Sequence, residues 1–360
     1  MKKLIGLFIF VLAAGFASAE LDDTDKRLLK DLKNKNAVKR SEAAHDLGEY
    51  KVEEAVPDLI AALQDSEAEV RAAAAGALWE IGKESKPAIP ALKELLQDED
   101  GWVRYNAAGT LQFLNVKDPG IVSALRNCLQ DQDPYLAVNA AGLIAYNQYL
   151  KPTELVPVLK AALRAPDPEL RKRVIDQIND VKELPHEFVP LLTSALEDPD
   201  ESIRWTAASG LSDAKPATPA VIAALRNSLH DRSEMVRSSA ADSLGRLGPE
   251  AAVAEADLLA MLQDKKTDVR KAAAEALGNL QLSSTAVVSA LIAALKDKET
   301  DVRQSAADAF EDIGMPAKAA VPALRAIWNN KKEDTFVRHA AGRALGKMGE
   351  TVDWKAEEKN

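Results

Sequence analysis

The stretch DSEAEVRAAAAGALWEIG, residues 65–82, decides the fold because altered copies of it recur along the whole chain. Its arginine marks the register of the copies. Ala137 takes the place of this arginine in one copy, so nine arginines and Ala137 mark ten units spaced by about 33 residues. A fixed period of this length predicts a solenoid and not a series of separate domains. The register arginines are Arg40, Arg71, Arg104, Arg171, Arg204, Arg237, Arg270, Arg303 and Arg338.

Each unit has the pattern of two helices joined by a short turn. The first helix carries a sequence such as VPDLIAAL at residues 56–63, and the second begins with a Val-Arg pair such as Val70-Arg71. Apolar residues then follow at the spacing of a helix. Paired alanines, such as Ala107-Ala108, are expected to let neighbouring helices approach closely.

An aspartate stands six residues before most of the register arginines, where the turn between the two helices is expected. Such a carboxylate can cap backbone N–H groups. With the arginine of a neighbouring unit it can also form an ion-pair ladder along the array. A charged binding track is the functional alternative, but the repeat spacing itself favours the structural interpretation. The aspartates are Asp65, Asp98, Asp131, Asp198, Asp231, Asp264 and Asp297.

This pattern resembles the HEAT-repeat family, whose proline, aspartate and Val-Arg positions match Pro57, Asp65 and Val70-Arg71. The resemblance implies an all-α fold, a right-handed superhelical solenoid of about ten two-helix repeats over residues 20–349, followed by a tail over residues 350–360. It also implies that the second helices line the concave face. A fold of this kind does not by itself define a function.

The first nineteen residues have the features of an export signal. Lys2 and Lys3 precede an apolar run over residues 4–16, and the segment 17–19 offers the small residues that a signal peptidase requires. The run is shorter than the roughly 20 residues that span a bilayer. We therefore predict a Sec signal peptide over residues 1–19, with an uncleaved anchor as the alternative. The mature chain is expected in a bacterial periplasm or outside the cell, without membrane insertion.

The composition offers little material for catalysis. The net charge of −10 argues against a nucleic-acid partner. The single cysteine, Cys128, excludes an internal disulfide and is predicted to be buried. Four histidines leave few candidates for metal ligation or acid–base chemistry. No catalytic residue, metal or cofactor is predicted.

Two HEAT-like enzyme families remain as alternatives. Deoxyhypusine hydroxylase holds iron with several His-Glu pairs, whereas this chain has one such pair, His186-Glu187, which is expected in the middle of a first helix. One pair cannot supply the ligands of a two-iron site. Bilin lyases share the repeat, but nothing beyond the repeat itself supports that activity.

The outward-facing positions of the second helices are the candidate binding surface. Two units carry the sequence Asn-Ala-Ala-Gly followed by an aromatic residue four positions later. An aromatic side chain beside a glycine is expected to leave an open slot with a flat apolar wall, suited to a peptide backbone or a sugar hydroxyl. The packing of these aromatic rings over adjacent helices is the structural alternative. The candidate partner-binding residues are Asn106, Phe113, Asn139, Tyr146, Tyr105 and Tyr149.

Beyond these residues the same surface becomes acidic. A solvated face is the simplest interpretation of such a series, and a concave groove that attracts a basic segment of a partner is the alternative. The acidic positions are Asp176, Asp180, Asp213, Asp242, Glu275, Asp308 and Asp312.

The sequence therefore predicts a non-enzymatic periplasmic scaffold that holds a protein or peptide on the concave face. An accessory subunit or a HEAT-like enzyme of the metal oxidoreductase or lyase type is the first alternative. The second is a cell-envelope module that binds glycan through Phe113 and Tyr146.

Overall fold

The computed structural model describes residues 21–354, and the regular elements in that range are all helical. Twenty α-helices follow one another along it, from α1 to α20, and in chain order they alternate between the first and second helices expected of the repeats. The all-α fold and the two helices expected in each sequence repeat are thus confirmed. The predicted signal peptide over residues 1–19 lies outside the described residues, as does the end of the tail, residues 355–360.

The chain divides into two compact units, residues 1–128 and 129–360. The described part of the first unit contains α1 (Asp23–Asp31), α2 (Ala37–Glu49), α3 (Val56–Ala62), α4 (Ala68–Ile81), α5 (Ile89–Leu95), α6 (Gly101–Phe113) and α7 (Pro119–Cys128).

The second unit begins with α8 (Pro134–Tyr146), α9 (Pro152–Ala162), α10 (Pro168–Asn179), α11 (Val189–Ala195), α12 (Glu201–Gly210), α13 (Pro219–Ser228) and α14 (Glu234–Leu247). It continues with α15 (Glu255–Met261), α16 (Thr267–Asn279), α17 (Thr285–Ala294), α18 (Thr300–Ile313), α19 (Val321–Asn329) and α20 (Thr335–Lys347). Short 3-10 helices occur in both units, among them η3 (Leu211–Asp213) and η4 (Pro249–Ala254).

The boundaries of the second helices follow from their terminal residues. At the start of α6, the Asp100 carboxylate accepts hydrogen bonds from the backbone N–H groups of Trp102 and Val103. At the end of α4 and α14, Gly82 and Gly248 adopt φ angles of 91° and 92°. Glycine has no Cβ and tolerates this left-handed backbone, so it ends the helix at little cost.

Within each of the two compact units, the core lies between neighbouring helices. Leucines such as Leu78 and Leu244 are fully buried there. Small residues bring neighbouring backbones together: a Cβ atom on Gly278 of α16 would lie 2.6 Å from the Cα atom of Ala309 in α18. Cys128 is fully buried and its thiol lies 3.5 Å from the Gly101 carbonyl oxygen, which confirms its predicted burial.

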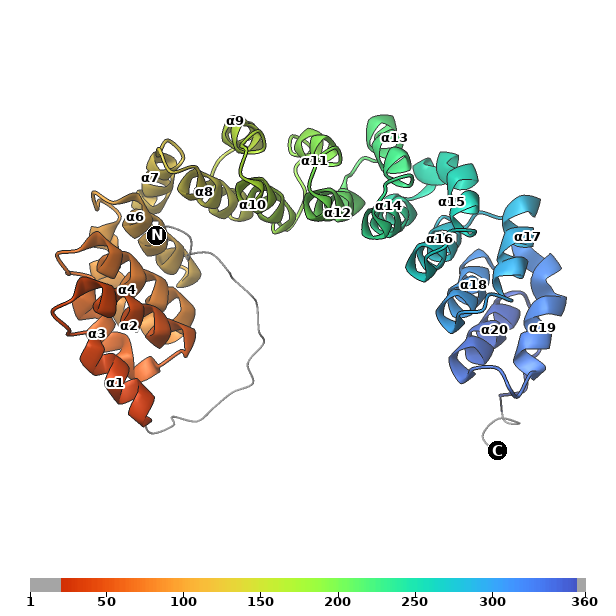
Figure 1. Cartoon of the computed structure of the whole chain (residues 1–360), viewed down its shortest axis with the longest axis horizontal. Helices are drawn as coiled ribbons and strands as arrows, with labels where there is room; N and C mark the ends of the chain where they lie inside the picture. Colours follow the sequence, from red (N-terminus) through yellow and green to blue (C-terminus); the bar gives the residue numbers. More distant parts are fainter. Residues whose placement is uncertain (1–20, 355–360) are drawn as a thin grey trace. The chain divides into compact units, whose positions relative to one another are not determined.

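The helices of the second unit form two layers. Figure 1 shows α9, α11 and α13 in one layer and α10, α12 and α14 in the other, on the concave side of this unit. We call the layer of even-numbered helices, from α8 to α20, the inner layer. The layer of odd-numbered helices, from α9 to α19, is the outer layer. Among the described residues, no helix has both the length and the apolar character needed to span a membrane.

Candidate functional site

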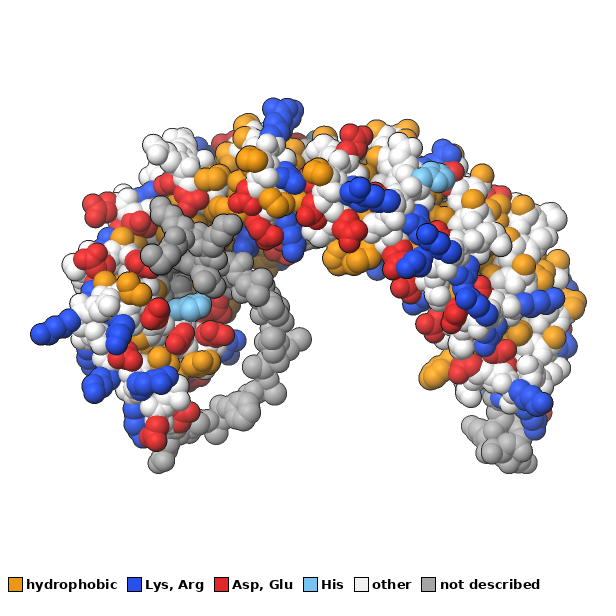
Figure 2. All heavy atoms as spheres, viewed as in Figure 1, with side chains coloured by type: hydrophobic (Ala, Val, Ile, Leu, Met, Phe, Trp, Pro, Cys, Tyr) orange, Lys and Arg blue, Asp and Glu red, His pale blue; other side chains and the backbone are white. Residues whose placement is uncertain are grey.

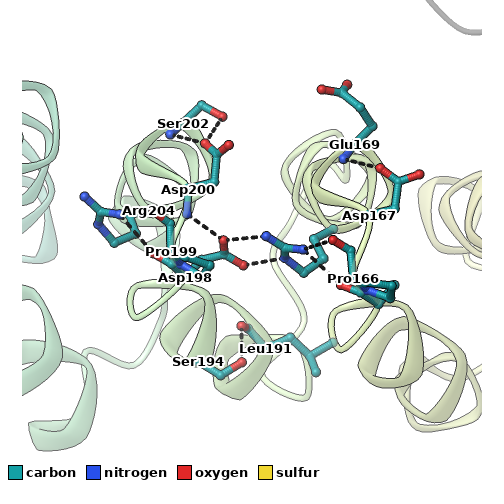
Figure 3. Close-up of polar contacts among 12 residues, drawn as sticks. Pro166, Asp167, Glu169, Leu191, Ser194, Asp198, Pro199, Asp200, Ser202 and Arg204 are labelled. Atoms are coloured by element: carbon teal, nitrogen blue, oxygen red, sulfur yellow. Dashed lines mark hydrogen bonds and ion pairs between the residues drawn. The ribbon is translucent and has the colours of Figure 1, made fainter.

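An arginine of one repeat and an aspartate of the next repeat form a two-pronged ion pair. Arg171 Nε and Nη2 donate to the two carboxylate oxygens of Asp198 over 2.8 and 3.0 Å. The remaining nitrogen, Nη1, donates to the backbone oxygens of Ala165 and Pro166. Asp198 also accepts from the backbone N–H of Asp200, as Figure 3 shows. Each pair therefore joins the interhelical turns of two neighbouring repeats.

This geometry recurs along both units and confirms the predicted ion-pair ladder. In the first unit the pairs are Arg40–Asp65 and Arg71–Asp98. In the second unit they are Arg171–Asp198, Arg204–Asp231, Arg237–Asp264 and Arg270–Asp297, and a final pair joins Arg303 to Glu333.

The ladder changes near Ala137, where both partner types are replaced. Ala137 occupies the arginine position, and Ala165 occupies the position six residues before Arg171. A buried charge left without its partner would be costly, so the absence of both types at this step is energetically consistent. A different contact is present here: the Tyr135 hydroxyl donates to Asp167 over 2.8 Å. Desolvation and this carboxylate raise the pKa of Tyr135 to about 12.

Pairing with arginine lowers the pKa of five ladder carboxylates, which are Asp65, Asp98, Asp231, Asp264 and Asp297. The hydrogen bonds from Arg40 and Arg270 are the largest causes for Asp65 and Asp297. At Asp231, burial is the largest single effect and raises the pKa, but the bonds from Arg204 and the Ser233 N–H outweigh it, so that the pKa is lowered. Because these aspartates are charged and paired with arginines, we assign the ladder a structural role in holding the repeats together.

The first unit holds three of the predicted partner-binding residues, Tyr105, Asn106 and Phe113. Phe113 is half exposed, at 50%. Asn106 Nδ2 instead donates to the Ala72 carbonyl oxygen of α4 over 3.0 Å. The Tyr105 ring packs against Trp79 and Trp102, with ring centroids 6.1 and 5.7 Å away.

The expected open slot at Gly109 is absent because the Trp79 ring fills it. A Cβ atom on Gly109 would lie 2.2 Å from a carbon of that ring. The glycine therefore makes room for an aromatic side chain of the preceding repeat, and the predicted slot is wrong at this position.

The second unit holds the other three residues, Asn139, Tyr146 and Tyr149. Tyr146 is exposed, and Lys182 Nζ lies 5.4 Å from its ring centroid. Desolvation raises the pKa of Tyr149, which is partly buried. Gln177 of the following repeat occupies the space beside Gly142, so the predicted slot is wrong here too.

All seven predicted acidic residues belong to the second unit. Asp176 lies on α10 and Asp180 caps its end, Asp213 lies on η3, Asp242 on α14, Glu275 on α16, and Asp308 and Asp312 on α18. Figure 2 shows Asp and Glu side chains along the inner margin of this unit, interspersed with Lys and Arg. The inner layer therefore presents carboxylates to solvent at successive repeats.

These inner-layer carboxylates differ from those of the ladder in their pKa. Desolvation by the surrounding helices raises the pKa of Asp176, Asp180, Asp308 and Asp312. It raises that of Asp242 to about 6, and the nearby charge of Glu275 adds to the effect. A raised pKa marks a carboxylate that has lost hydration without gaining enough positive charge.

A hollow of about 320 Å³ opens beside Asp242, and sequence reasoning missed most of its wall. Trp205 contributes an indole that is 41% exposed. The sequence contains a signal for Trp205, because it directly follows the register arginine Arg204, as Tyr105 follows Arg104. The other lining residues are Ser209, Ser212, Ser238, Ser239, Ser243, Arg246, Glu275 and Asn279.

The His186-Glu187 pair lies in the turn before α11 and not in the middle of a first helix, so that prediction is wrong. Its ring Nδ1 lies 3.3 Å from Glu187, and the histidine side chain is well exposed. Pro185 and the preceding turn break the helical pattern at this point. Within residues 21–354, no group of three or more His, Cys, Asp or Glu side chains is arranged to hold a metal ion.

The described part of the tail folds back onto the last repeat. Trp354 packs against Trp328 and His339, with ring centroids 4.8 and 5.7 Å away. A Cβ atom on Gly342 would come within 2.9 Å of both indoles. Trp354 thus covers the final helix pair, which has no following repeat to pack against among the described residues.

Helices that alternate in a regular repeat, buried leucines such as Leu78 and Leu244, and a ladder of ion pairs define an α-helical repeat solenoid. A family model of HEAT repeats matches residues 26–112, 122–212, 189–256, 225–311 and 288–355. The chain belongs to the HEAT-repeat family. No curated protein matches the sequence.

Solved structures agree with this fold. An engineered protein is 22% identical, covers 92% of this chain and is itself covered completely, with a TM-score of 0.52. A structure of importin beta is 17% identical, with 90% of this chain and 50% of that chain covered and a TM-score of 0.59.

A structure of Kap95p, described as binding RanGDP, is 14% identical, with 93% and 51% covered and a TM-score of 0.57. The chain spans about half the length of these last two proteins. At such identities the likeness shows the fold alone.

Proposed function

We propose that this chain is a non-enzymatic scaffold that holds a protein or peptide partner on the inner layer of its second unit. The observation that carries the proposal is the contrast in pairing. The aspartates of the ladder have arginine partners, whereas Asp176 and Asp242 make no hydrogen bond or ion pair through their side chains within the described residues.

The charge of this surface favours a partner segment that carries lysine or arginine. Such a segment would supply positive charge to inner-layer carboxylates such as Asp176 and Asp242, which have no ion pair within the described residues. The ladder holds consecutive repeats in a fixed geometry, so the surface is preformed and little ordering is needed on binding. Many weak contacts along successive repeats would then add up to a specific complex.

The location that we propose is the bacterial periplasm or the exterior of the cell. The features of residues 1–19, with two lysines, an apolar run and small residues before Glu20, support export. The intact mass of the protein from a periplasmic fraction tests this: a chain beginning at Glu20 is expected. A full-length chain in the cytoplasm would contradict the proposal.

Site-specific photocrosslinking in living cells tests the binding surface. A benzophenone amino acid at Asp213 lies at the inner layer, and the same group at Glu250 on η4, before outer-layer helix α15, is the matched control. Both positions are exposed. We expect a discrete crosslinked protein from position 213 that weakens with salt, and none from position 250. Equal crosslinking from both positions would contradict the proposed surface.

A further inference from the structure

The hollow beside Asp242 has a wall that is already fixed by contacts between repeats. Ser243 Oγ of α14 donates to the Ala208 carbonyl oxygen of α12 over 2.7 Å. One turn earlier, Ser239 Oγ donates to the carbonyl oxygen of Trp205 over 3.4 Å. These bonds hold the two helices side by side, so the exposed indole of Trp205 stands beside the hollow without any rearrangement.

The charged groups in the hollow are poorly matched within the protein. The Asp242 carboxylate and the Arg246 guanidinium make no hydrogen bond or ion pair within residues 21–354, although they stand four residues apart on α14. Glu275 accepts a hydrogen bond from Ser305 Oγ over 2.9 Å, and Lys271 Nζ lies 3.8 Å away. Asp242 is thus an acceptor at the hollow without a hydrogen bond or ion pair among the described residues, on which only the more distant charges of Arg246 and Lys271 act favourably.

The chemistry of the wall excludes most classes of ligand. The lining is polar apart from the indole, so an apolar ligand would leave many groups without hydrogen bonds. Asp242 and Glu275 would repel an anion. An uncharged ligand would add nothing to the positive charge of Arg246 and Lys271, which does not outweigh the desolvation of the Asp242 carboxylate. A cation satisfies both carboxylates and is attracted to the face of an indole ring.

We propose that this hollow binds a cationic side chain, lysine or arginine, of the partner segment, with the cation over the Trp205 ring and beside the Asp242 and Glu275 carboxylates. The inference rests on the proposed function because it uses the same inner-layer surface. It adds the chemical class of the anchoring side chain and the residues that recognise it. Arg246, at one side of the hollow, opposes the cation and sets the orientation of the segment.

The pKa of Asp242, about 6, gives a second signature of such an anchor. A bound cation favours the charged carboxylate and lowers this pKa. Binding near pH 6 therefore releases protons to the solvent. Calorimetric titrations in two buffers with different heats of ionisation measure that release, and Asp242→Asn is expected to abolish it.

The experiment uses the mature protein labelled with 5-fluorotryptophan and the peptide pentalysine as the probe. The Trp205 resonance in the fluorine NMR spectrum is assigned by its disappearance in Trp205→Phe. We expect pentalysine to shift this resonance saturably, while a peptide of five N-acetylated lysines leaves it unchanged. Pentaarginine in a parallel titration shows which of the two cations binds more tightly.

Variants with opposite expected effects make the test specific. Trp205→Leu keeps apolar bulk but removes the ring, and Asp242→Asn removes the charge; each is expected to weaken binding by about tenfold. Arg246→Ala is expected to strengthen it. Asp213→Asn, outside the hollow on the same acidic surface, controls for general electrostatic attraction and is expected to change affinity less than about twofold. Dispersed fluorine resonances of the other tryptophans show that each variant is folded.

An unmoved Trp205 resonance would overturn the inference, and so would equal losses from Asp213→Asn and Asp242→Asn. If a partner crosslinks at position 213 while Trp205 does not respond to pentalysine, the inferred cation site is contradicted and the proposed function is supported. A response of Trp205 in a chain that crosslinks no partner supports the anchor and contradicts the proposed function.

Discussion

Asp231 and Asp242 lie eleven residues apart in the chain, and both lose hydration, but only Asp231 gains hydrogen bonds from an arginine that outweigh this loss. Asp231 receives two hydrogen bonds from Arg204, over 2.7 and 2.9 Å, and its pKa is lowered. Asp242 lies at the hollow and makes no side-chain hydrogen bond or ion pair within residues 21–354, and its pKa is raised to about 6. The comparison separates carboxylates that hold the repeats together from carboxylates that are available to another molecule. Four predictions test this separation.

The largest effect is expected at the ladder. Arg204 and Asp231 have side chains that are only 6% and 14% exposed, so Arg204→Ala leaves a nearly buried carboxylate unpaired. We expect a loss of about 3 kcal/mol in the free energy of unfolding. Urea unfolding together with hydrogen exchange of α12 and α14 measures it, because solenoids need not unfold in a single step.

The control for this variant is Arg226→Ala, which breaks an ion pair with Asp257. The Arg226 side chain is 40% exposed, so a loss below about 1 kcal/mol is expected. Similar losses from the two variants would show that burial does not distinguish the ladder from an ordinary surface ion pair.

The second effect concerns the dependence of stability on pH. Arg270 lowers the pKa of Asp297 below its ordinary value of 3.8. The pair therefore contributes stability at neutral pH that is lost as the pH falls through the folded-state pKa. We expect Asp297→Asn to cost about 2 kcal/mol at pH 7, with a difference from the parent protein that shrinks below about pH 4. A difference that stays constant down to pH 2 would contradict this origin.

The third effect has the opposite sign. Because the pKa of Asp242 is higher in the folded protein, the native state binds a proton more tightly between about pH 4 and 6. Stability from this group therefore increases as the pH falls from 7 towards 4. Asp242→Asn is expected to stabilise the protein at pH 7 by about 1 kcal/mol or less, after allowance for solvent screening at this exposed site.

Thermal unfolding at pH 7 and at pH 4.5 measures the Asp242→Asn effect, which is expected to shrink at the lower pH. The same substitution is expected to weaken the binding of pentalysine, so the stability of the protein increases while its affinity for the peptide decreases. Destabilisation at pH 7 would place Asp242 with the structural carboxylates.

The smallest effect is expected at Asp308, which shares properties of both groups. It lies on the inner layer and its pKa is raised by desolvation, but Arg343 Nη2 donates to it over 2.6 Å. The two contributions oppose each other, so Asp308→Asn is expected to change the free energy of unfolding by less than about 0.5 kcal/mol. Urea unfolding checks this value, and a loss above about 1 kcal/mol would assign Asp308 to the fold.

The sequence by itself determined the repeat, the two helices of each unit and the partners of the ladder. Both the apolar spacing and the Arg and Asp positions recur with a period of about 33 residues. The same pattern therefore predicts the helices within a repeat and the ion pairs between neighbouring repeats. The burial of Cys128 followed from its core position for the same reason.

Only the tertiary structure decided which outward-facing residues remain accessible. Trp79 fills the slot at Gly109, and Gln177 fills the slot at Gly142. Both side chains come from other repeats, and the pattern within one repeat does not specify where they point. The hollow combines side chains of α12, α14 and α16, and the packing between these helices fixes its wall. The raised pKa of Asp242 has the same origin, because desolvation depends on how closely neighbouring helices surround a carboxylate.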